Sequence, residues 1–503
     1  MSTSAAEFKA KVARSVIPGP STPIVTAHRL RPGRLLARLA IVLGVTQMVF
    51  FGGLVLGQMV PDKPVIQRLA QAVDDGTYGP SSLPDRMGGI SDSFTECVVV
   101  GTGLGAPPDQ SALYRAAYMP RISNCASGGG QIKTLSWGGE VDPSPYFKYW
   151  AGYTVLVRPV LAIAGMEGVR LVIGALLAAG IAVGVGGFAR RSTWPLAVML
   201  FGPLLIASNV MSTPSTALSN ALALAVMFAG LGISAWAAPR GMAAVALVSM
   251  MAGSLYCYVD LLTNPPLAWM LTMSVTAIIV ARTVGARSAM ASSLIAGLAW
   301  ILGFGLTWVS RWLIAMAWVG PAQTLAVVKE NVAFRTTGSN PVVQSGIGQG
   351  ITANTQWWWT RVPSAAPLLW LLLAALVVAG TVWLIRSRHL PGWRAVAALL
   401  IPALVPVLWY VVMSNHSQIH AFFTYRAVPG AVGVIGAGLL AALFLPREDG
   451  RSMPLPATPE SATREQLTPE QPAPETPAEP AAIDGVEPTV PVPPSDLEAG
   501  TLS

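Results

Sequence analysis

The sequence predicts an all-α polytopic membrane protein with about ten transmembrane helices. The chain of 503 residues is 53% apolar and has a mean hydropathy of +0.55. Only 11% of its residues are charged, whereas a soluble domain carries about 25%. Apolar stretches of spanning length, about 20 residues, recur along the chain. These observations exclude a disordered chain, a soluble enzyme and a nucleic-acid-binding protein.

The first element is a basic segment, residues 1–35, with six lysines and arginines before an apolar run begins. That run continues to full membrane length, so we expect a permanent first span and not a cleavable signal peptide. Nine further runs follow. The expected spans are about 36–59, 168–188, 194–211, 217–236, 242–259, 266–283, 288–310, 366–385, 395–413 and 428–446. The apolar character persists around 311–326, where an extra short or re-entrant helix is an alternative.

The orientation follows from the arginines of the short loops. Arginines stand in alternate loops, and the opposite short loops, near 212–216 and 261–265, have no lysine or arginine. Cytoplasmic loops carry the excess of lysine and arginine. Ten spans with both termini in the cytoplasm satisfy this rule.

This topology leaves two long segments outside, about 60–167 and 319–364, within one membrane domain of residues 36–446. The aromatic, amphipathic stretch 145–165 predicts a helix lying in the membrane interface. Residues 447–503 hold eleven acidic residues against three arginines and are rich in proline, which predicts a disordered cytoplasmic tail.

Polar residues beside spans are costly and therefore indicate function. In the first outer segment, Asp92 and Glu96 lie four apart in the sequence Ser-Asp-Ser-Phe-Thr-Glu-Cys. Both carboxylates fit on one helical face, where one is suited to act as a general base on a sugar hydroxyl. A solvated loop or a helix cap is the structural alternative.

Asp260 ends the span 242–259 and precedes a turn containing Asn264 and two prolines. The dipole disfavours an acid at a helix C-terminus, so we expect Asp260 to bind a cation, a hydroxyl or a metal. From residue 143 to 446 the only other acids are Glu167 and Glu330.

Residues 414–426 read Ser-Asn-His-Ser-Gln-Ile-His-Ala-Phe-Phe-Thr-Tyr-Arg. His416 and His420 share one helical face, but the sequence shows no third ligand for a metal, so no metal site is predicted. Together with Tyr425 and Arg426 they predict hydrogen bonding to a phosphate or a sugar. Anchoring in the membrane interface is the alternative.

A basic and aromatic set completes the candidates. Arginine clamps phosphate with two parallel hydrogen bonds, and the three tryptophans at 357–359 suit an interfacial belt or stacking on a sugar ring. The set comprises Lys148, Tyr149, Trp150, Arg158, Arg335 and Arg361. Of the three cysteines, Cys97 and Cys125 share the first outer segment and pair if it faces an oxidising compartment.

The chain has no phosphate-cradling Gly-Lys-Ser/Thr loop, so we expect no use of ATP. Its plan and motifs resemble the GT-C class of polytopic glycosyltransferases, and also bacterial multi-span proteins of envelope-polysaccharide contexts. Ala151 stands where such proteins have a histidine. The resemblance rests on residues 92–97, 146–153, 158–159, 258–265, 414–420 and 423–426.

The resemblance implies a bacterial plasma-membrane enzyme that moves a sugar from a polyprenyl-phosphate donor to an envelope glycan, lipid or protein. It implies Asp92 as the base, with Glu96 as second choice, and basic and aromatic residues around the lipid phosphate. We expect no cofactor, although donors with a pyrophosphate often require a divalent metal. The alternatives are a transporter of a lipid-linked glycan and a non-catalytic assembly subunit that docks through the tail.

Overall fold

The computed structural model describes residues 32–78, 93–336, 343–361, 365–387 and 393–445. These residues lie in one compact unit, Met1–Glu448. The described residues are all-α apart from two short strands, as the sequence predicts. The predictions for Asp92, for residues 1–31 and for the tail fall outside the described residues.

The described residues contain nine helices that are long and apolar enough to span a membrane, and up to ten if one bent pair is a single span. The bent pair is α8 (Trp194–Ile206) with Val210–Thr216, which meet at 65°. Each predicted span has its counterpart here. The nine are α2 (Pro32–Met59), α7 (Thr154–Arg191), α10 extended (Leu218–Arg240), α11 (Met242–Val259), α12 (Pro265–Thr283), α13 (Ala286–Trp318), the first part of α16 (Ala365–Val382), α17 with α18 (Arg394–Val412) and α20 with α21 (Ala421–Ala442).

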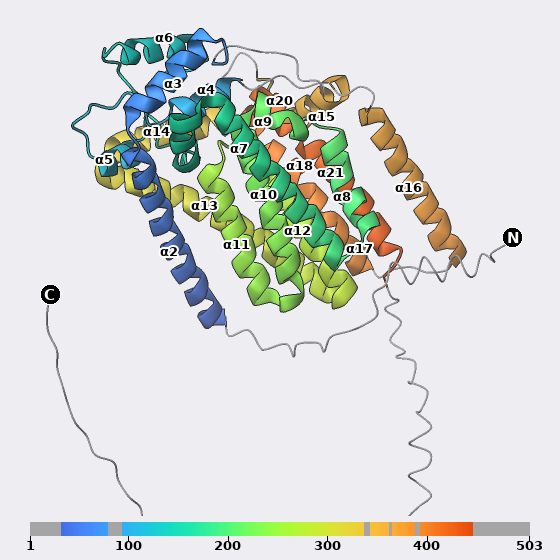
Figure 1. The fold of residues 1–503 in the computed structure, drawn as a ribbon. Coiled ribbons are helices and arrows are strands. Elements are labelled where there is room, and N and C mark those ends of the chain that lie inside the picture. The colour runs from blue at the N-terminus through green and yellow to red at the C-terminus, as the bar shows by residue number, and fades with distance from the viewer. Residues whose placement is uncertain (1–31, 79–92, 337–342, 362–364, 388–392, 446–503) are drawn as a thin grey trace, which may run out of the picture. The chain divides into compact units, whose positions relative to one another are not determined.

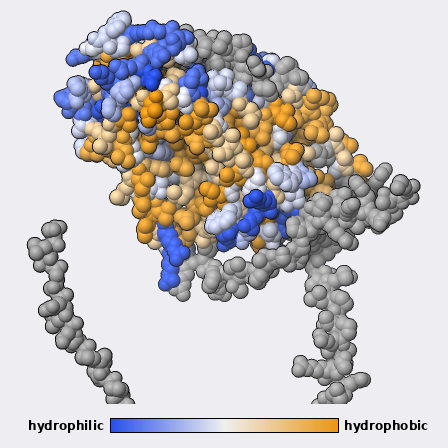
Figure 2. Space-filling view, in the orientation of Figure 1, coloured by the Kyte–Doolittle hydropathy of each residue, from blue (hydrophilic) through white to orange (hydrophobic). Residues whose placement is uncertain are grey.

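One end of the spans carries the long segments between them, and we call this end the loop face (Figure 1). Figure 2 shows a broad apolar band over the spans, with hydrophilic residues gathered above it around α3 and α6. The segments of this face contain α3 (Asp62–Asp74), α4 (Ser93–Gly101), α5 (Ala112–Tyr118), β1 (Pro120–Arg121), α6 (Cys125–Ser136), β2 (Ser144–Pro145), α14 (Pro321–Thr336), α15 (Gln349–Arg361) and α19 (Ser414–Ile419).

Polar contacts fix the first of these segments to the spans. A disulfide joins Cys97 to Cys125 and thereby α4 to α6. Asp62 accepts hydrogen bonds from Arg115 at 2.7 Å and from Arg158 at 2.5 Å. The Arg158 guanidinium also donates to three backbone carbonyls, those of Gly57, Val60 and Gly103. The segment is therefore anchored from α2 and α7.

Glycines allow the spans to pack closely. A Cβ atom on Gly180 or Gly184 of α7 would stand 2.6 Å from a carbonyl oxygen of α10. A Cβ atom on Gly253 of α11 would stand 2.1 Å from a carbonyl oxygen of α13, and one on Gly303 of α13 would stand 2.1 Å from a carbonyl oxygen of α11. Association of membrane helices depends on such van der Waals contact, because lipid supplies no hydrophobic driving force between them.

The helix expected over 145–165 is displaced. Residues 146–153 form no regular helix, and α7 begins at Thr154 and breaks at Gly165, where φ is 67°. Phe147 and Trp150 are fully buried and do not lie in the interface. The Trp150 indole donates to the carbonyl of Thr307 at 2.5 Å, so the ring combines full burial with a satisfied N–H. Near 311–326, α13 continues to Trp318, and α14 follows after Gly320.

Candidate functional site

A tight turn on the loop face joins α11 to α12 and holds Asp260. The Asp260 carboxylate accepts the backbone N–H of Thr263 at 3.0 Å and its hydroxyl at 2.5 Å. Leu262 inside the turn has φ 65°. Burial raises the pKa of the Asp260 carboxyl to about 7, and the bonds from Thr263 partly oppose that rise. The turn thus presents a carboxyl group that changes charge near neutral pH.

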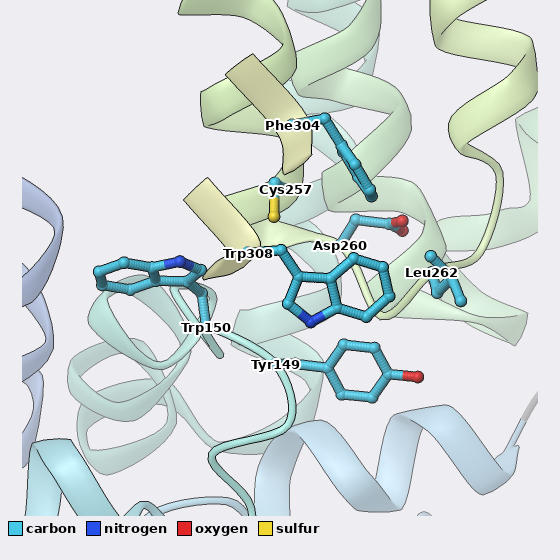
Figure 3. A pocket seen from close by; sticks show the side chains of 7 residues that line it. All are labelled: Tyr149, Trp150, Cys257, Asp260, Leu262, Phe304 and Trp308. Atoms are coloured by element: carbon cyan, nitrogen blue, oxygen red, sulfur yellow. The ribbon is translucent and has the colours of Figure 1, made fainter. Parts of the chain in front are cut away.

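Asp260 lies on a small pocket with aromatic walls (Figure 3). Figure 3 shows the Tyr149 ring below that of Trp308, and the two ring centroids are 6.2 Å apart. The Asp260 carboxylate lies above and to the right of the Trp308 ring, and Leu262 lies to its right. The lining comprises Tyr149, Trp150, Cys257, Asp260, Leu262, Phe304 and Trp308.

Helix α13 holds the segment that supplies Tyr149 and Trp150. The Trp308 indole donates to the carbonyl of Lys148 at 2.8 Å, and Arg311 donates to that of Tyr149 at 3.0 Å. With the Trp150–Thr307 bond, these contacts fix three consecutive residues on one helix. The aromatic wall is therefore rigidly positioned, as a recognition site requires.

Two cations gather at the same segment. Arg335 of α14 is buried and donates to the Tyr149 hydroxyl at 2.6 Å. The Lys148 ammonium lies 5.2 Å from the ring centroid of Tyr146. Burial, followed by Arg335 and Arg121, lowers the pKa of Lys148 to about 8. Within the described residues neither cation has an ion-pair partner, so the site carries a local positive charge suited to an anion.

The two histidines lie beside these cations. Their ring centroids are 4.7 Å apart, and His416 Nε2 lies 2.8 Å from the carbonyl oxygen of Leu262. Burial, His420 and Arg335 lower the pKa of His416 well below its usual value. Burial, Arg335 and Lys148 lower the pKa of His420 to about 4. Both rings are thus neutral at pH 7.

Several hydrogen bonds unite the histidine segment with its surroundings. Asn264 donates to the carbonyl of Phe423 at 2.7 Å. Asn354 of α15 donates to the carbonyl of Ser417 at 2.9 Å and accepts from the Thr424 hydroxyl at 2.6 Å. The structure therefore brings Lys148, Tyr149, Trp150, Asp260, Asn264, His416 and His420 into one neighbourhood of the loop face.

Other predicted site residues serve the scaffold. Arg158 anchors the first segment as described above. Tyr425 and Arg426 are buried and both bond to Asn209, at 3.0 Å and 2.8 Å. Glu96 accepts from Arg170 of α7 at 2.6 Å, next to the disulfide. Contacts of this kind orient the framework.

Arg361 is exposed, and its guanidinium stands 4.7 Å over the ring of Trp357. Asp92 lies outside the described residues. No group of three or more potential ligands drawn from His, Cys, Asp and Glu gathers anywhere in the described part of the chain.

Arg311 was missed by the sequence reasoning. Its side chain is fully buried, and its Nη1 has no hydrogen-bond partner among the described residues. A lone arginine inside the apolar run of α13 was the available signal, because a charge within a span is expensive.

No family model, no curated protein and no solved structure matches this chain. The chemistry of the site therefore has to be argued from its groups alone. It offers two cations for an anion, aromatic faces for an apolar ring surface, and a carboxyl and two neutral imidazoles for hydroxyl groups.

Proposed function

We propose that this chain is a membrane glycosyltransferase. It moves a sugar from a polyprenyl-phosphate donor to a cell-envelope glycan, lipid or protein at the loop face, which is the extracytoplasmic side. The donor reaches the site laterally from the bilayer.

One observation carries the proposal. Two cations without ion-pair partners in the described residues, Lys148 and Arg335, adjoin neutral hydrogen-bonding groups and an aromatic pocket on the loop face. A lipid-linked sugar phosphate presents the matching groups, namely an anion, hydroxyls and a ring face. Charge-assisted hydrogen bonds to a phosphate are about twice as strong as neutral ones.

The reaction needs a base and a stabilised leaving group. A carboxylate takes the proton of the acceptor hydroxyl as its oxygen attacks C1 of the sugar. The C1–O bond to the phosphate then breaks, and the polyprenyl phosphate leaves with the electron pair. Lys148 and Arg335 stabilise the charge that develops on this phosphate.

Asp92 remains our first assignment for the base, with the resemblance of residues 92–97 as its support. Glu96 is less suited to this role because Arg170 occupies its carboxylate. Asp260 lines the pocket and has a pKa near neutrality, which suits a general base. We assign Asp260 to hydroxyl binding and test it beside Asp92.

The experiment compares lipid-linked sugars and envelope glycans in a strain that lacks the gene. The strain is complemented with wild type, Asp92→Asn, Asp260→Asn or the exposed control Lys329→Gln. We expect one sugar to be missing from the glycan while its polyprenyl-phosphate donor accumulates, with rescue by wild type and the control alone.

Other outcomes redirect the assignment. Full activity of Asp92→Asn would remove that residue from the role of base. Accumulation of a complete lipid-linked glycan on the cytoplasmic side would replace the transferase by a transporter. Loss of function upon deletion of residues 449–503, with no effect of either aspartate change, would indicate an assembly subunit.

A further inference from the structure

The hydrogen bond between His416 and Leu262 defines the tautomer of the His416 ring. Its Nε2 lies 2.8 Å from the carbonyl oxygen of Leu262. A carbonyl oxygen only accepts, so Nε2 must carry the hydrogen. A neutral imidazole has one donor and one acceptor nitrogen. The remaining nitrogen, Nδ1, is therefore a bare acceptor.

This acceptor has no partner in the described residues. His416 Nδ1 is buried and forms no hydrogen bond there, and the same holds for Nδ1 of His420 beside it. A buried acceptor without a donor destabilises the folded state, because it has lost its hydrogen bond to water. Native structures satisfy most such groups or reserve them for a function.

The bare nitrogen discriminates between ligand groups. The oxygens of a phosphodiester are acceptors and carry no hydrogen at neutral pH, so they cannot bond to Nδ1. A sugar hydroxyl has the hydrogen that Nδ1 requires. The side chains of Lys148 and Arg335 donate hydrogen bonds and carry positive charge, which suits them to the phosphate. Both lie near the histidine rings, because both lower the pKa of His420.

We propose that His416 is a specificity-determining residue that recognises a hydroxyl of the donor sugar through Nδ1, while Lys148 and Arg335 hold the phosphate. This inference rests on the proposed function and deepens it by assigning the sugar and the phosphate to different residues. His420, whose ring centroid lies 4.7 Å from that of His416, is partly exposed.

The turn that follows α11 serves this recognition as a positioning device. Asp260 holds Thr263, and the strained Leu262 between them directs its carbonyl to His416. The carbonyl fixes both the ring orientation and the tautomer, in the way that outer partners fix other functional histidines. Asp260 thus acts on the sugar subsite through His416 as well as through the pocket.

Two isosteric substitutions separate the two nitrogens of His416. In His416→Gln the amide reaches the position of Nε2, so the Leu262 bond survives and the Nδ1 acceptor is lost. In His416→Asn the amide oxygen occupies the position of Nδ1, so the acceptor survives and the Leu262 bond is lost. Each variant is the control for the other.

The measurement is binding to the purified full chain in nanodiscs at pH 8. The probes are short-chain polyprenyl phosphate without a sugar and a panel of the corresponding phosphoryl hexoses and pentoses. We expect wild type to bind one sugar-bearing lipid at least about 10-fold more tightly than the bare lipid, as one hydrogen bond allows. His416→Gln should lose this preference and His416→Asn should keep part of it, with bare-lipid affinity unchanged in both.

The opposite pattern, or preference kept in both variants, would overturn the inference. If both variants lose the preference, the ¹⁵N resonance of His416 Nδ1 in the wild type decides. A shift caused only by the sugar-bearing lipid supports the inference, and an unchanged resonance refutes it.

The same binding measurement also tests the proposed function, independently of the inference about His416. Equal binding of bare and sugar-bearing lipids by wild type refutes the sugar subsite but leaves phosphate recognition intact. Wild type that binds none of the probes refutes the lipid-phosphate donor itself, and the inference with it.

Discussion

The arginines of the loop face divide according to their partners. Arg158 donates to three carbonyls and to Asp62, so its hydrogen bonds are committed to the fold. Arg335 donates to Asn331 and to the Tyr149 hydroxyl, and its Nε has no partner in the described residues. The first arginine therefore stabilises the scaffold, and the second retains capacity for a ligand.

Arg335→Gln should raise the KM for the lipid-phosphate donor by about 10- to 100-fold, because it removes a charge-assisted bond of about 1.5–3 kcal/mol. Its thermal unfolding temperature should remain close to that of wild type. The exposed Lys329→Gln on the same helix is the matched control. An unchanged KM in Arg335→Gln would assign Arg335 to the scaffold.

Arg158→Gln should behave in the opposite way. It leaves Asp62 with Arg115 and removes donors from buried carbonyls, and breaking a buried pair costs about 3–5 kcal/mol. We expect a large fall in unfolding temperature and in the yield of folded protein in detergent. A variant with normal stability but no donor binding would return Arg158 to the binding site.

Asp260 predicts a pH dependence of stability. Its folded pKa of about 7 lies above the usual 3.8, so the folded state binds the proton more tightly than the unfolded state. Stability from this group is present at low pH and is lost as pH rises through about 7. The unfolding temperature of wild type minus that of Asp260→Asn should therefore fall between pH 5 and 8. The lowered pKa values of the two histidines act in the other direction and cancel in this difference. A flat difference would contradict a buried, neutral Asp260.

Among the elements, the first outer segment depends on a covalent link. The disulfide closes a loop with a sequence separation of 28 and joins α4 to α6. It also stands beside the ion pair of Glu96 with Arg170. Loss of the link would therefore loosen the contact between this segment and α7.

Replacing Cys97 and Cys125 by serine should lower the free energy of unfolding by about 3.6 kcal/mol, the value expected for a loop of this length. Thermal unfolding with and without reductant measures it. Because disulfides persist in oxidising compartments, protein taken from cells should show no free thiol at these positions. Labelling of both cysteines without reductant would argue against an extracytoplasmic loop face.

For the whole molecule, the placement of charge predicts the orientation in the membrane. Arg190, Arg240, Arg282 and Arg287 lie at helix ends opposite the loop face, and cytoplasmic loops carry such an excess. Reporter fusions after residue 448 should therefore be active only in the cytoplasm, and fusions within 60–78 only outside. A fusion after residue 448 that is active outside would mean that the bent pair around Ile206 does not cross the membrane.

The sequence by itself determined the order and approximate limits of the spans, because spanning a bilayer imposes one length and one composition on each helix. It also located the polar motifs at one face, since charges avoid the bilayer interior. The periodicity of the sequence could not reveal which polar side chains bond to backbone carbonyls and which keep an unbonded donor. Arg158 is an example of the first kind, and Arg335, whose Nε has no partner among the described residues, is an example of the second.

Only the tertiary structure decided that residues 146–153 are a buried wall and not an interfacial helix. The choice depends on partners distant in sequence, such as Thr307 for Trp150. It also decided the environment of Asp260. Seen along the sequence, that carboxyl ends a helix unfavourably, whereas in space it faces the N–H and hydroxyl of Thr263 and shapes the turn that touches His416. The Asp260–Thr263 bonds are local, but the contacts of Trp150 with Thr307 and of His416 with Leu262 join segments more than a hundred residues apart, so no local pattern encodes these two.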